Sequence, residues 1–365
     1  MSAPLLSPLE LRPPVGARPG VVAPNRVWLA PLTNKQSHDD GTLSDDELGF
    51  LAMRADGGLG IVETCAAHVA QDGKAWSGEL GVHHDAMIPG LRRLAARIHQ
   101  GGALASAQLF HGGLRADPSV SGVPRWSASH DVETATPARA ATEDDLARVI
   151  REFADAARRC AEAGFDAIEL HGAHGYLLSQ FLSTVYNRRT DRWGGSLENR
   201  ARLIREVLRA VREVAPSLVR AVRLSPEDFG QAKGLDLDET IEVARWLAED
   251  GMEVLHLSLW RAHLPTTKRP ESHATPLFRA AVGSKVKIVV AGAIWTREEA
   301  ELQLAHGADA VALGRSAIAN HDWIHRAHTA REIARAPVTA EHLRSQGLSD
   351  GFVDYMRNWK GYVAG

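Results

Sequence analysis

Residues 167–176 of the chain read Ala-Ile-Glu-Leu-His-Gly-Ala-His-Gly-Tyr. Its first four residues, Ala167–Leu170, have the short, largely apolar character of a buried parallel strand. His171, His174 and Tyr176 follow directly, and the small residues between them leave room for a ligand. Polar groups at the end of an apolar strand are unfavourable unless they find partners. The stretch therefore predicts a strand whose carboxyl end carries a functional site.

Seven further segments share this character. They are short, largely apolar on both faces, and separated by more residues than a hairpin allows, which is typical of buried parallel strands. The eight predicted strands are Val27–Leu32, Leu59–Glu63, Leu104–Leu109, Ala167–Leu170, Val219–Leu224, Val254–Leu257, Ile288–Ala291 and Ala310–Leu313.

Helices with recognisable starts lie between several of these strands. In Ser44-x-x-Glu47, Thr142-x-x-Asp145 and Thr296-x-x-Glu299, a hydroxyl can cap the helix while a carboxylate reaches back to the cap. The helix after Thr142 carries an apolar stripe from Leu146 to Cys160 at steps of three and four residues, which would pack against a sheet.

Eight strands with helices between them fit a single (β/α)₈ barrel better than an open sheet. A doubly wound sheet needs a glycine-rich phosphate loop after its first strand, and Pro31-Leu32-Thr33 follows that strand instead. The sixth helix, near Thr275–Ala281, has the weakest pattern. Since no linker, repeat or low-complexity segment interrupts the chain, we expect residues 1–365 to form one domain with a C-terminal tail at about 335–365.

Charge and composition exclude several classes of protein. The chain has 42 Lys+Arg and 45 Asp+Glu, whereas nucleic-acid and membrane-surface binders usually carry a basic excess. No segment approaches the roughly 18 apolar residues of a membrane-spanning helix, and the proline-rich N-terminus does not resemble a signal peptide. Cys65 and Cys160 cannot form a disulfide framework. We expect a cytoplasmic protein that binds neither nucleic acid nor membrane.

Polar residues and glycines gather where the predicted strands end. They are Thr33, Thr64, Gln108, His171, His174, Tyr176, Arg223, Gly292 and Gly314-Arg315. A lone histidine in such a place is more often a satisfied core residue than a ligand. Zinc is a further option, but a catalytic site needs about three protein ligands and this histidine pair supplies two. We interpret the nearby run 83–85 as a loop in which Asp85 caps a helix, and we expect no metal.

Two longer motifs connect these positions to a known family. HGAHGYLLSQFL at 171–182 and NRRTDRWGGSLENR at 187–200 closely resemble the signature of the old yellow enzyme family of FMN oxidoreductases. The resemblance covers most of the chain, with NRVWLAPLT at 25–33, QLFHGG at 108–113, VRLSPEDF at 222–229 and ALGRSAI at 312–318. Any one motif alone would be weak. Together, in order and at strand ends, they are specific.

The resemblance implies FMN bound non-covalently at the C-terminal mouth of the barrel. The phosphate would lie against Gly292-Ala293 and Gly314-Arg315, where glycine permits close approach and an arginine fork suits a dianion. Pro31, Leu32 and Thr33 match the segment beside the flavin ring. Thr64 stands where relatives have a small residue near the ring. Gln108 matches the glutamine that pairs with the pyrimidine edge, and Arg223 matches the arginine next to N1 and C2=O.

The resemblance also implies an ene-reductase. NADPH or NADH would reduce the flavin, and an activated alkene would then accept hydride on its β-carbon. His171 and His174 match the pair that holds the substrate oxygen, and Tyr176 matches the proton donor to the α-carbon.

The signature is mixed between branches of the family. Thr33 replaces the cysteine of one branch, so direct thiol tuning of the flavin should be lacking, whereas the double histidine and the tail follow that same branch. The spacing Tyr355-x-Arg357-x-Trp359 resembles a tail that sends an arginine into a neighbouring subunit's site. By this analogy Arg357 completes a partner's substrate pocket, and we expect a homo-oligomer, a dimer or a tetramer. An ordinary surface helix is the alternative interpretation.

Three alternative functions stay open. A reductase of nitroesters or nitroaromatics would use the same residues, and a non-catalytic flavin-binding barrel would keep the fold. A metal-dependent lyase or hydrolase would need several carboxylates at the strand ends. Relatives with an iron–sulfur cluster are excluded, because two distant cysteines cannot hold one. Trp126 and Trp260, in loops near the predicted mouth, could line a substrate pocket or serve packing.

Overall fold

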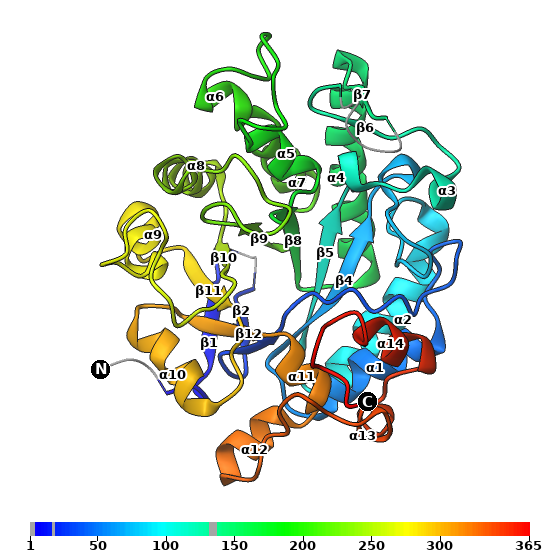
Figure 1. Ribbon diagram of the computed structural model, residues 1–365, viewed down its shortest axis with the longest axis vertical. Coiled ribbons are helices and arrows are strands. Elements are labelled where there is room, and N and C mark those ends of the chain that lie inside the picture. Colours follow the sequence, from blue (N-terminus) through cyan, green and yellow to red (C-terminus); the bar gives the residue numbers. More distant parts are fainter. Residues whose placement is uncertain (1–3, 17–18, 131–136) are drawn as a thin grey trace.

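The computed structural model describes residues 4–16, 19–130 and 137–365 of the predicted 1–365 domain, so parts of the N-terminal segment lie outside the described residues. A closed barrel of eight parallel strands occupies its centre, and helices surround it (Figure 1). The barrel strands run in the order β3-β4-β5-β8-β9-β10-β11-β12, and β12 pairs with β3 to close the ring. The (β/α)₈ prediction is confirmed.

All eight predicted strands are present. The barrel strands are β3 (Val27–Leu29), β4 (Ile61–His68), β5 (Leu104–Phe110), β8 (Ala167–Gly172), β9 (Val219–Leu224), β10 (Val254–Ser258), β11 (Lys287–Ala291) and β12 (Ala310–Leu313). The first of them, β3, ends earlier than predicted because Pro31 has no N–H to continue the ladder. The second, β4, runs past Glu63 through an irregularity in its pairing with β5, and Thr64 and Cys65 lie at that irregularity.

Four short strands lie outside the barrel. β1 (Leu9–Arg12) and β2 (Val21–Ala23) form an antiparallel pair, and β6 (Trp126–Ser127) pairs with β7 (Arg139–Ala140). Leu9 and Leu11 pack with Trp28 and Ile61 in the apolar cluster that fills one end of the barrel interior. This packing leaves the carboxyl ends of the barrel strands as the end that can bind a ligand.

The helices connect the strands and cover the outside of the barrel. They are α1 (Asp45–Asp56), α2 (Ile88–Gln100), α3 (Pro118–Ser121), α4 (Glu143–Ala163), α5 (Leu177–Leu182), α6 (Leu197–Arg200), α7 (Arg202–Val214), α8 (Leu237–Asp250), α9 (Ala274–Val282), α10 (Arg297–Ala305), α11 (Arg315–Ala319), α12 (Trp323–Thr329), α13 (Ala340–Ser345) and α14 (Asp350–Met356). Short 3₁₀ turns are η1 (Gln71–Gly73), η2 (Asp85–Met87) and η3 (Gly113–Arg115). No helix in the described ranges is both long and apolar enough to cross a membrane.

Two of the three predicted capping boxes form completely. Thr142 with Asp145, and Thr296 with Glu299, exchange both hydrogen bonds at the starts of α4 and α10. Ser44 caps α1 as expected, but Glu47 does not reach back to it.

The Glu47 carboxylate turns into the core instead, where it accepts hydrogen bonds from Asn34, Ser37 and the Cys65 thiol. The interpretation of Asp85 as a helix cap was also wrong. The His84 side chain caps η2, and Asp85 pairs with Arg158 and Arg159.

The C-terminal tail returns to the barrel of its own chain. In Figure 1, α14 lies beside α1, and the Phe352 and Phe50 rings meet edge to face with centroids 5.2 Å apart. The Tyr362 hydroxyl donates to the Arg315 carbonyl oxygen at 2.8 Å. These contacts bring α14 and the residues after it to the end of the barrel that carries the predicted site.

Candidate functional site

A cavity of about 380 Å³ opens at the carboxyl ends of the barrel strands, within the size range of small-molecule sites. It brings together ten of the sequence-predicted residues: Pro31, Leu32, Thr33, His174, Tyr176, Arg223, Gly292, Ala293, Gly314 and Arg315. A second depression, of about 690 Å³, lies on the outside between α8 and α9 and contains none of the predicted residues. We therefore take the first cavity as the candidate site.

Four predicted residues do not line this cavity. Thr64 is buried in β4, where its hydroxyl donates to the Cys65 carbonyl oxygen and accepts from the Gln108 amide. Gln108 is buried inside the barrel, and His171 is buried beside His174 and Tyr176 with 3% of its surface exposed. Arg357 pairs weakly with Asp354 and is 49% exposed. Contact of these four residues with a cofactor or substrate stays a prediction.

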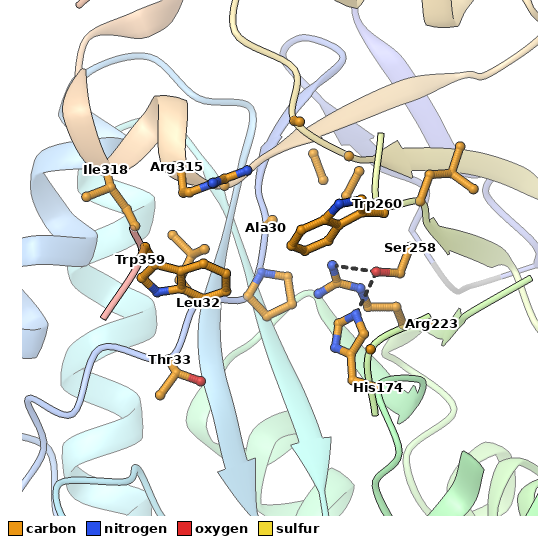
Figure 2. A pocket seen from close by; sticks show the side chains of 18 of the residues that line it. Ala30, Leu32, Thr33, His174, Arg223, Ser258, Trp260, Arg315, Ile318 and Trp359 are labelled. Carbon is orange, nitrogen blue, oxygen red and sulfur yellow. Dashed lines mark hydrogen bonds between the residues drawn. The ribbon is translucent and has the colours of Figure 1, made fainter. Parts of the chain in front are cut away.

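His171, His174 and Tyr176 form one cluster after β8. The His171 ring centroid lies 4.9 Å from that of His174 and 5.0 Å from that of Tyr176. His174 has a φ of 60°, an unusual value for a residue other than glycine, and such strain is often found at functional sites. This conformation places the His174 ring against Ser258, with Nε2 and Oγ 2.7 Å apart (Figure 2).

Both imidazoles are neutral at physiological pH. Burial lowers the pKa of His171 well below its usual value, and His174 and Arg223 lower it further. Burial and the Arg223 charge lower the pKa of His174 in the same direction. The buried His171 Nδ1 finds no hydrogen-bond partner among the described residues. A neutral ring with an unused nitrogen can donate to, or accept from, a ligand without adding charge.

Arg223 joins the cavity to a polar network inside the barrel. Its Nη2 donates to Ser258 Oγ at 3.2 Å (Figure 2), whereas its buried Nε is unpartnered within the described part of the chain. Burial lowers the Arg223 pKa, and the charges of Glu169 and Glu63 oppose that effect. Arg223 therefore stays a cation, and a carboxylate inside the barrel compensates its charge.

Glu169 and Glu63, inside the barrel, have opposite protonation states. Burial alone would raise the pKa of Glu169, but His256, Arg223 and Gln108 together lower it. Gln108 Nε2 donates to Glu169 at 2.7 Å, and His256 Nδ1 lies 2.6 Å from the other carboxylate oxygen. Burial, with the nearby Glu169 charge, raises the Glu63 pKa well above its usual value. Glu169 is thus ionised and Glu63 is protonated.

Glu63, Glu169 and His256 could also be considered as metal ligands. One ligand-type atom of each lies within 4.8 Å of the others. However, both Glu169 oxygens already accept hydrogen bonds, and the neighbouring Arg223 supplies a positive charge. Because a divalent cation would be repelled by that arginine, the donor set favours a hydrogen-bonded ion-pair network.

The two glycines predicted to contact phosphate have different surroundings. A Cβ at Gly292 would lie 2.5 Å from the Leu259 carbonyl oxygen, so the glycine is already required by loop packing. A Cβ at Gly314 would meet only Leu32, at an ordinary 3.6 Å. Packing therefore does not require glycine at 314, and its missing side chain leaves part of the cavity unoccupied by protein atoms. Arg315 follows it, with its guanidinium 5.7 Å from the Trp359 ring centroid.

Several cavity residues were not predicted from the sequence, and Trp260 was left open between a pocket role and packing. Ser258 follows the apolar run of β10 as a single hydroxyl, and its position at a strand end was the signal that could have identified it. Phe229 and Trp260, from the loops after β9 and β10, stack with centroids 4.2 Å apart. Figure 2 shows Trp260 and Trp359 approaching the cavity from opposite sides. Arg115 and Tyr355 also line it, and no strand pattern marks either one.

The two tryptophans left open by the sequence have different roles. Trp126 is fully buried and donates to Asp72 at 2.7 Å, so it serves packing. Trp260 lines the cavity and is 47% exposed.

Comparison with known proteins places the chain in a family. Residues 19–333 match the model of the NADH:flavin oxidoreductase / NADH oxidase family. A solved old yellow enzyme homologue from Zymomonas mobilis superposes with a TM-score of 0.81 at 27% identity, covering 97% of this chain and 99% of that one. The chain belongs to the old yellow enzyme family of NADH:flavin oxidoreductases.

Two curated relatives agree with this membership. The chain is 35% identical over 328 residues to the probable NADH-dependent flavin oxidoreductase YqiG of Bacillus subtilis, covering 87% of this chain and 88% of the relative. It is 36% identical over 240 residues to an NADPH dehydrogenase of Bacillus licheniformis, covering 66% and 70% respectively. This old yellow enzyme family member is thus an NADH- or NADPH-dependent flavin oxidoreductase.

Proposed function

We propose that this family member is an FMN-dependent ene-reductase that takes reducing equivalents from NADPH or NADH. Its substrate would be an alkene activated by a neighbouring carbonyl group. The observation that carries the proposal is the cluster of neutral His171, neutral His174 and protonated Tyr176 beside a cavity that also holds Arg223. Metal-dependent chemistry is disfavoured, because no Asp or Glu of the described chain lines the cavity.

The residues present fit FMN. Arg223 offers an unpartnered buried Nε and a compensated positive charge, as required beside an electron-rich ring edge. Gly314 leaves space that no side chain fills, and Arg315 provides a fork for a phosphate. Pro31, Leu32 and Thr33 form one wall of the cavity. When bound, FMN would supply hydride transfer, which no side chain can perform.

The protein's own residues would then activate the alkene. Neutral imidazole N–H groups of His171 and His174 can donate to the substrate carbonyl oxygen. The Ser258 contact fixes the orientation of the His174 ring. As negative charge develops on that oxygen in the transition state, these donors stabilise it within a site shielded from water.

Tyr176 would complete the reaction by donating its phenolic proton to the α-carbon. Burial raises the Tyr176 pKa, and the nearby Arg115 charge opposes this rise. The phenol is therefore protonated at neutral pH, as a general acid must be. Its ring is held against Phe110 with centroids 5.0 Å apart, so its position does not depend on the substrate.

The test separates the two half-reactions without oxygen. NADPH should bleach the flavin absorbance, and cyclohex-2-enone should restore it. Tyr176→Phe should slow the second step about 100-fold, within the usual range for loss of a general acid, and leave the first unchanged. Tyr355→Phe is the matched variant, since Tyr355 is the other phenol lining the cavity. A larger effect of Tyr355→Phe would move the acid role to that residue. A flavin that is restored by nitro compounds but not by enones would identify a nitro reductase.

We also propose that the protein forms a homo-oligomer in which Arg357 reaches a neighbouring subunit's cavity. In its own chain, Arg357 is half-exposed and does not line the cavity, whereas Tyr355, Met356 and Trp359 around it do. Because Arg357 is exposed and its neighbours line the cavity, its side chain is accessible to a second copy of this chain. Sedimentation of the holoenzyme at several concentrations would test the assembly, and a monomer throughout would contradict it.

A further inference from the structure

Two cations at one side of the cavity have no role in the reaction described above. Arg115, at the end of η3, lines the cavity with its guanidinium carbon 4.3 Å from the centroid of the Tyr176 ring. Its Nη1 donates to the His174 carbonyl oxygen at 2.7 Å. The strained backbone of His174 and the Tyr176 ring thus hold an exposed arginine beside the proposed acid.

Lys35 is the second cation. It is exposed and has a φ of 56°, in the left-handed region that favours glycine. Its Nζ lies 5.3 Å from the centroid of the Tyr355 ring, and Tyr355 lines the cavity. Arg115 lies over the Tyr176 ring and Lys35 lies over the Tyr355 ring, and both rings line the same cavity. Arg115, Lys35, Tyr176 and Tyr355 therefore form one corner, which we call the cationic corner.

The charges of the cavity do not balance without a ligand. Its described lining contains three arginines, Arg115, Arg223 and Arg315, and no carboxylate. Arg223 is compensated by Glu169 inside the barrel, and Arg315 faces the phosphate of the proposed cofactor. Among the residues that the structure describes, the side-chain contacts of Arg115 are the His174 carbonyl oxygen and the Tyr176 ring, that of Lys35 is the Tyr355 ring, and none is a carboxylate. The positive potential of the cationic corner is therefore left for a ligand to neutralise.

We propose that the cationic corner binds a carboxylate on the substrate, so that the preferred substrates are α,β-unsaturated carbonyl compounds that also carry an acid group. An arginine fork accepts a carboxylate through two parallel hydrogen bonds, and a lysine adds a mobile point charge. Because the corner adjoins Tyr176, the acid group of a bound alkene would lie near that tyrosine. This inference rests on the proposed ene-reductase function and names its substrate class.

The test compares a charged ligand with its uncharged ester. They are (E)-4-oxopent-2-enoate and its methyl ester, which lacks the charge and is larger by one methyl group, titrated calorimetrically into the oxidised FMN holoenzyme, so that the measurement does not depend on turnover. The variants are Arg115→Met, Lys35→Met and the double variant. Lys285→Met is the control, because Lys285 is an exposed lysine just before β11, at the opposite end of the barrel.

The wild type should bind the acid more tightly than the ester. Arg115→Met should reduce this preference about tenfold and Lys35→Met about threefold, in line with ion pairs near a protein surface. The control should keep the preference. Added salt should weaken binding of the acid and leave the ester unaffected.

Equal binding of the acid and the ester, or failure of the acid to bind, would overturn the inference. It would also be overturned if Arg115→Met raised KM for NADH while keeping the preference for the acid, since the corner would then serve the phosphates of the nicotinamide cofactor. Turnover of the same two compounds by the wild type tests the proposed function separately. If the enzyme reduces the ester but binds the acid no more tightly than the ester, the ene-reductase proposal stands and only the proposed substrate class is refuted.

Discussion

Exchanging Glu169 for glutamine should destabilise the protein far more than the same exchange at Glu63. Both carboxyl groups are fully buried inside one barrel. Glu169 is ionised, accepts from Gln108 and His256, and compensates Arg223. Glutamine would remove that charge and place an amide N–H against one of the two donors. Breaking a buried ion pair costs about 3–5 kcal/mol, which for a chain of this size corresponds to a melting temperature lower by about 5 °C.

Glu63→Gln is the matched control because Glu63 is already neutral at pH 7. An amide replaces a protonated acid with little change in shape or charge. The raised pKa adds a pH signature. The native carboxyl binds a proton that the unfolded one has lost above about pH 4.3, so the contribution of Glu63 to wild-type stability falls as pH rises, at most by about 1 kcal/mol per pH unit. Glu63→Gln should remove this slope.

Urea unfolding of the cofactor-free protein between pH 5 and pH 8 would measure both effects. At pH 7 the free energy of unfolding should be much lower in Glu169→Gln than in the wild type. In Glu63→Gln it should change little or increase. Equal losses in the two variants would refute the assigned charges. A stability curve of Glu63→Gln parallel to that of the wild type would refute the raised pKa.

Three further predictions concern the cavity and its surroundings. Gly314→Ala should fold normally but bind FMN at least tenfold more weakly, measured by flavin fluorescence, whereas Gly292→Ala should itself destabilise the protein, because its Cβ would overlap a carbonyl oxygen. His171 and His256 are buried and neutral with lowered pKa values, so their contribution to stability should be intact above pH 6.5 and fall by about 1 kcal/mol per histidine for each pH unit below it; a melting temperature of Glu63→Gln, which lacks the opposing Glu63 slope, that is independent of pH between 5 and 7 would contradict this. Arg357→Ala should raise KM for the alkene and leave the melting temperature unchanged, and identical kinetics would show that the tail arginine serves no site.

The fold could be predicted because each barrel strand is recognisable from the composition of its own few residues. Apolar runs such as Ala310–Leu313 are buried on both faces, and their composition alone separates them from the amphipathic helices. The errors lie where tertiary contacts override a local rule. Glu47 stands at the right spacing for a capping box, but Asn34, Ser37 and Cys65 offer its carboxylate a better set of partners in the core.

The candidate site was predictable at strand ends and not in loops. His174, Tyr176 and Arg223 follow strands directly, so their positions are set by the barrel. Arg115 and Tyr355 reach the cavity through a short turn and through a helix near the C-terminus. Those approaches depend on long-range packing, which leaves no periodic signal in the sequence. The family resemblance supplied the roles of the strand-end residues but not those of these two.

The closure of β12 onto β3 has a consequence for how the protein is made. Because the strand at Val27–Leu29 completes its pairing with Ala310–Leu313, the ring cannot close on the ribosome until nearly the whole chain has emerged. The cavity needs still later residues, since Trp359 forms part of its wall. Until then, the strands that are synthesised first have one edge without hydrogen-bond partners. Exposed strand edges promote aggregation and chaperone binding. The complete cavity can therefore form only after the tail has been synthesised, and premature termination before the tail should weaken binding of the cofactor.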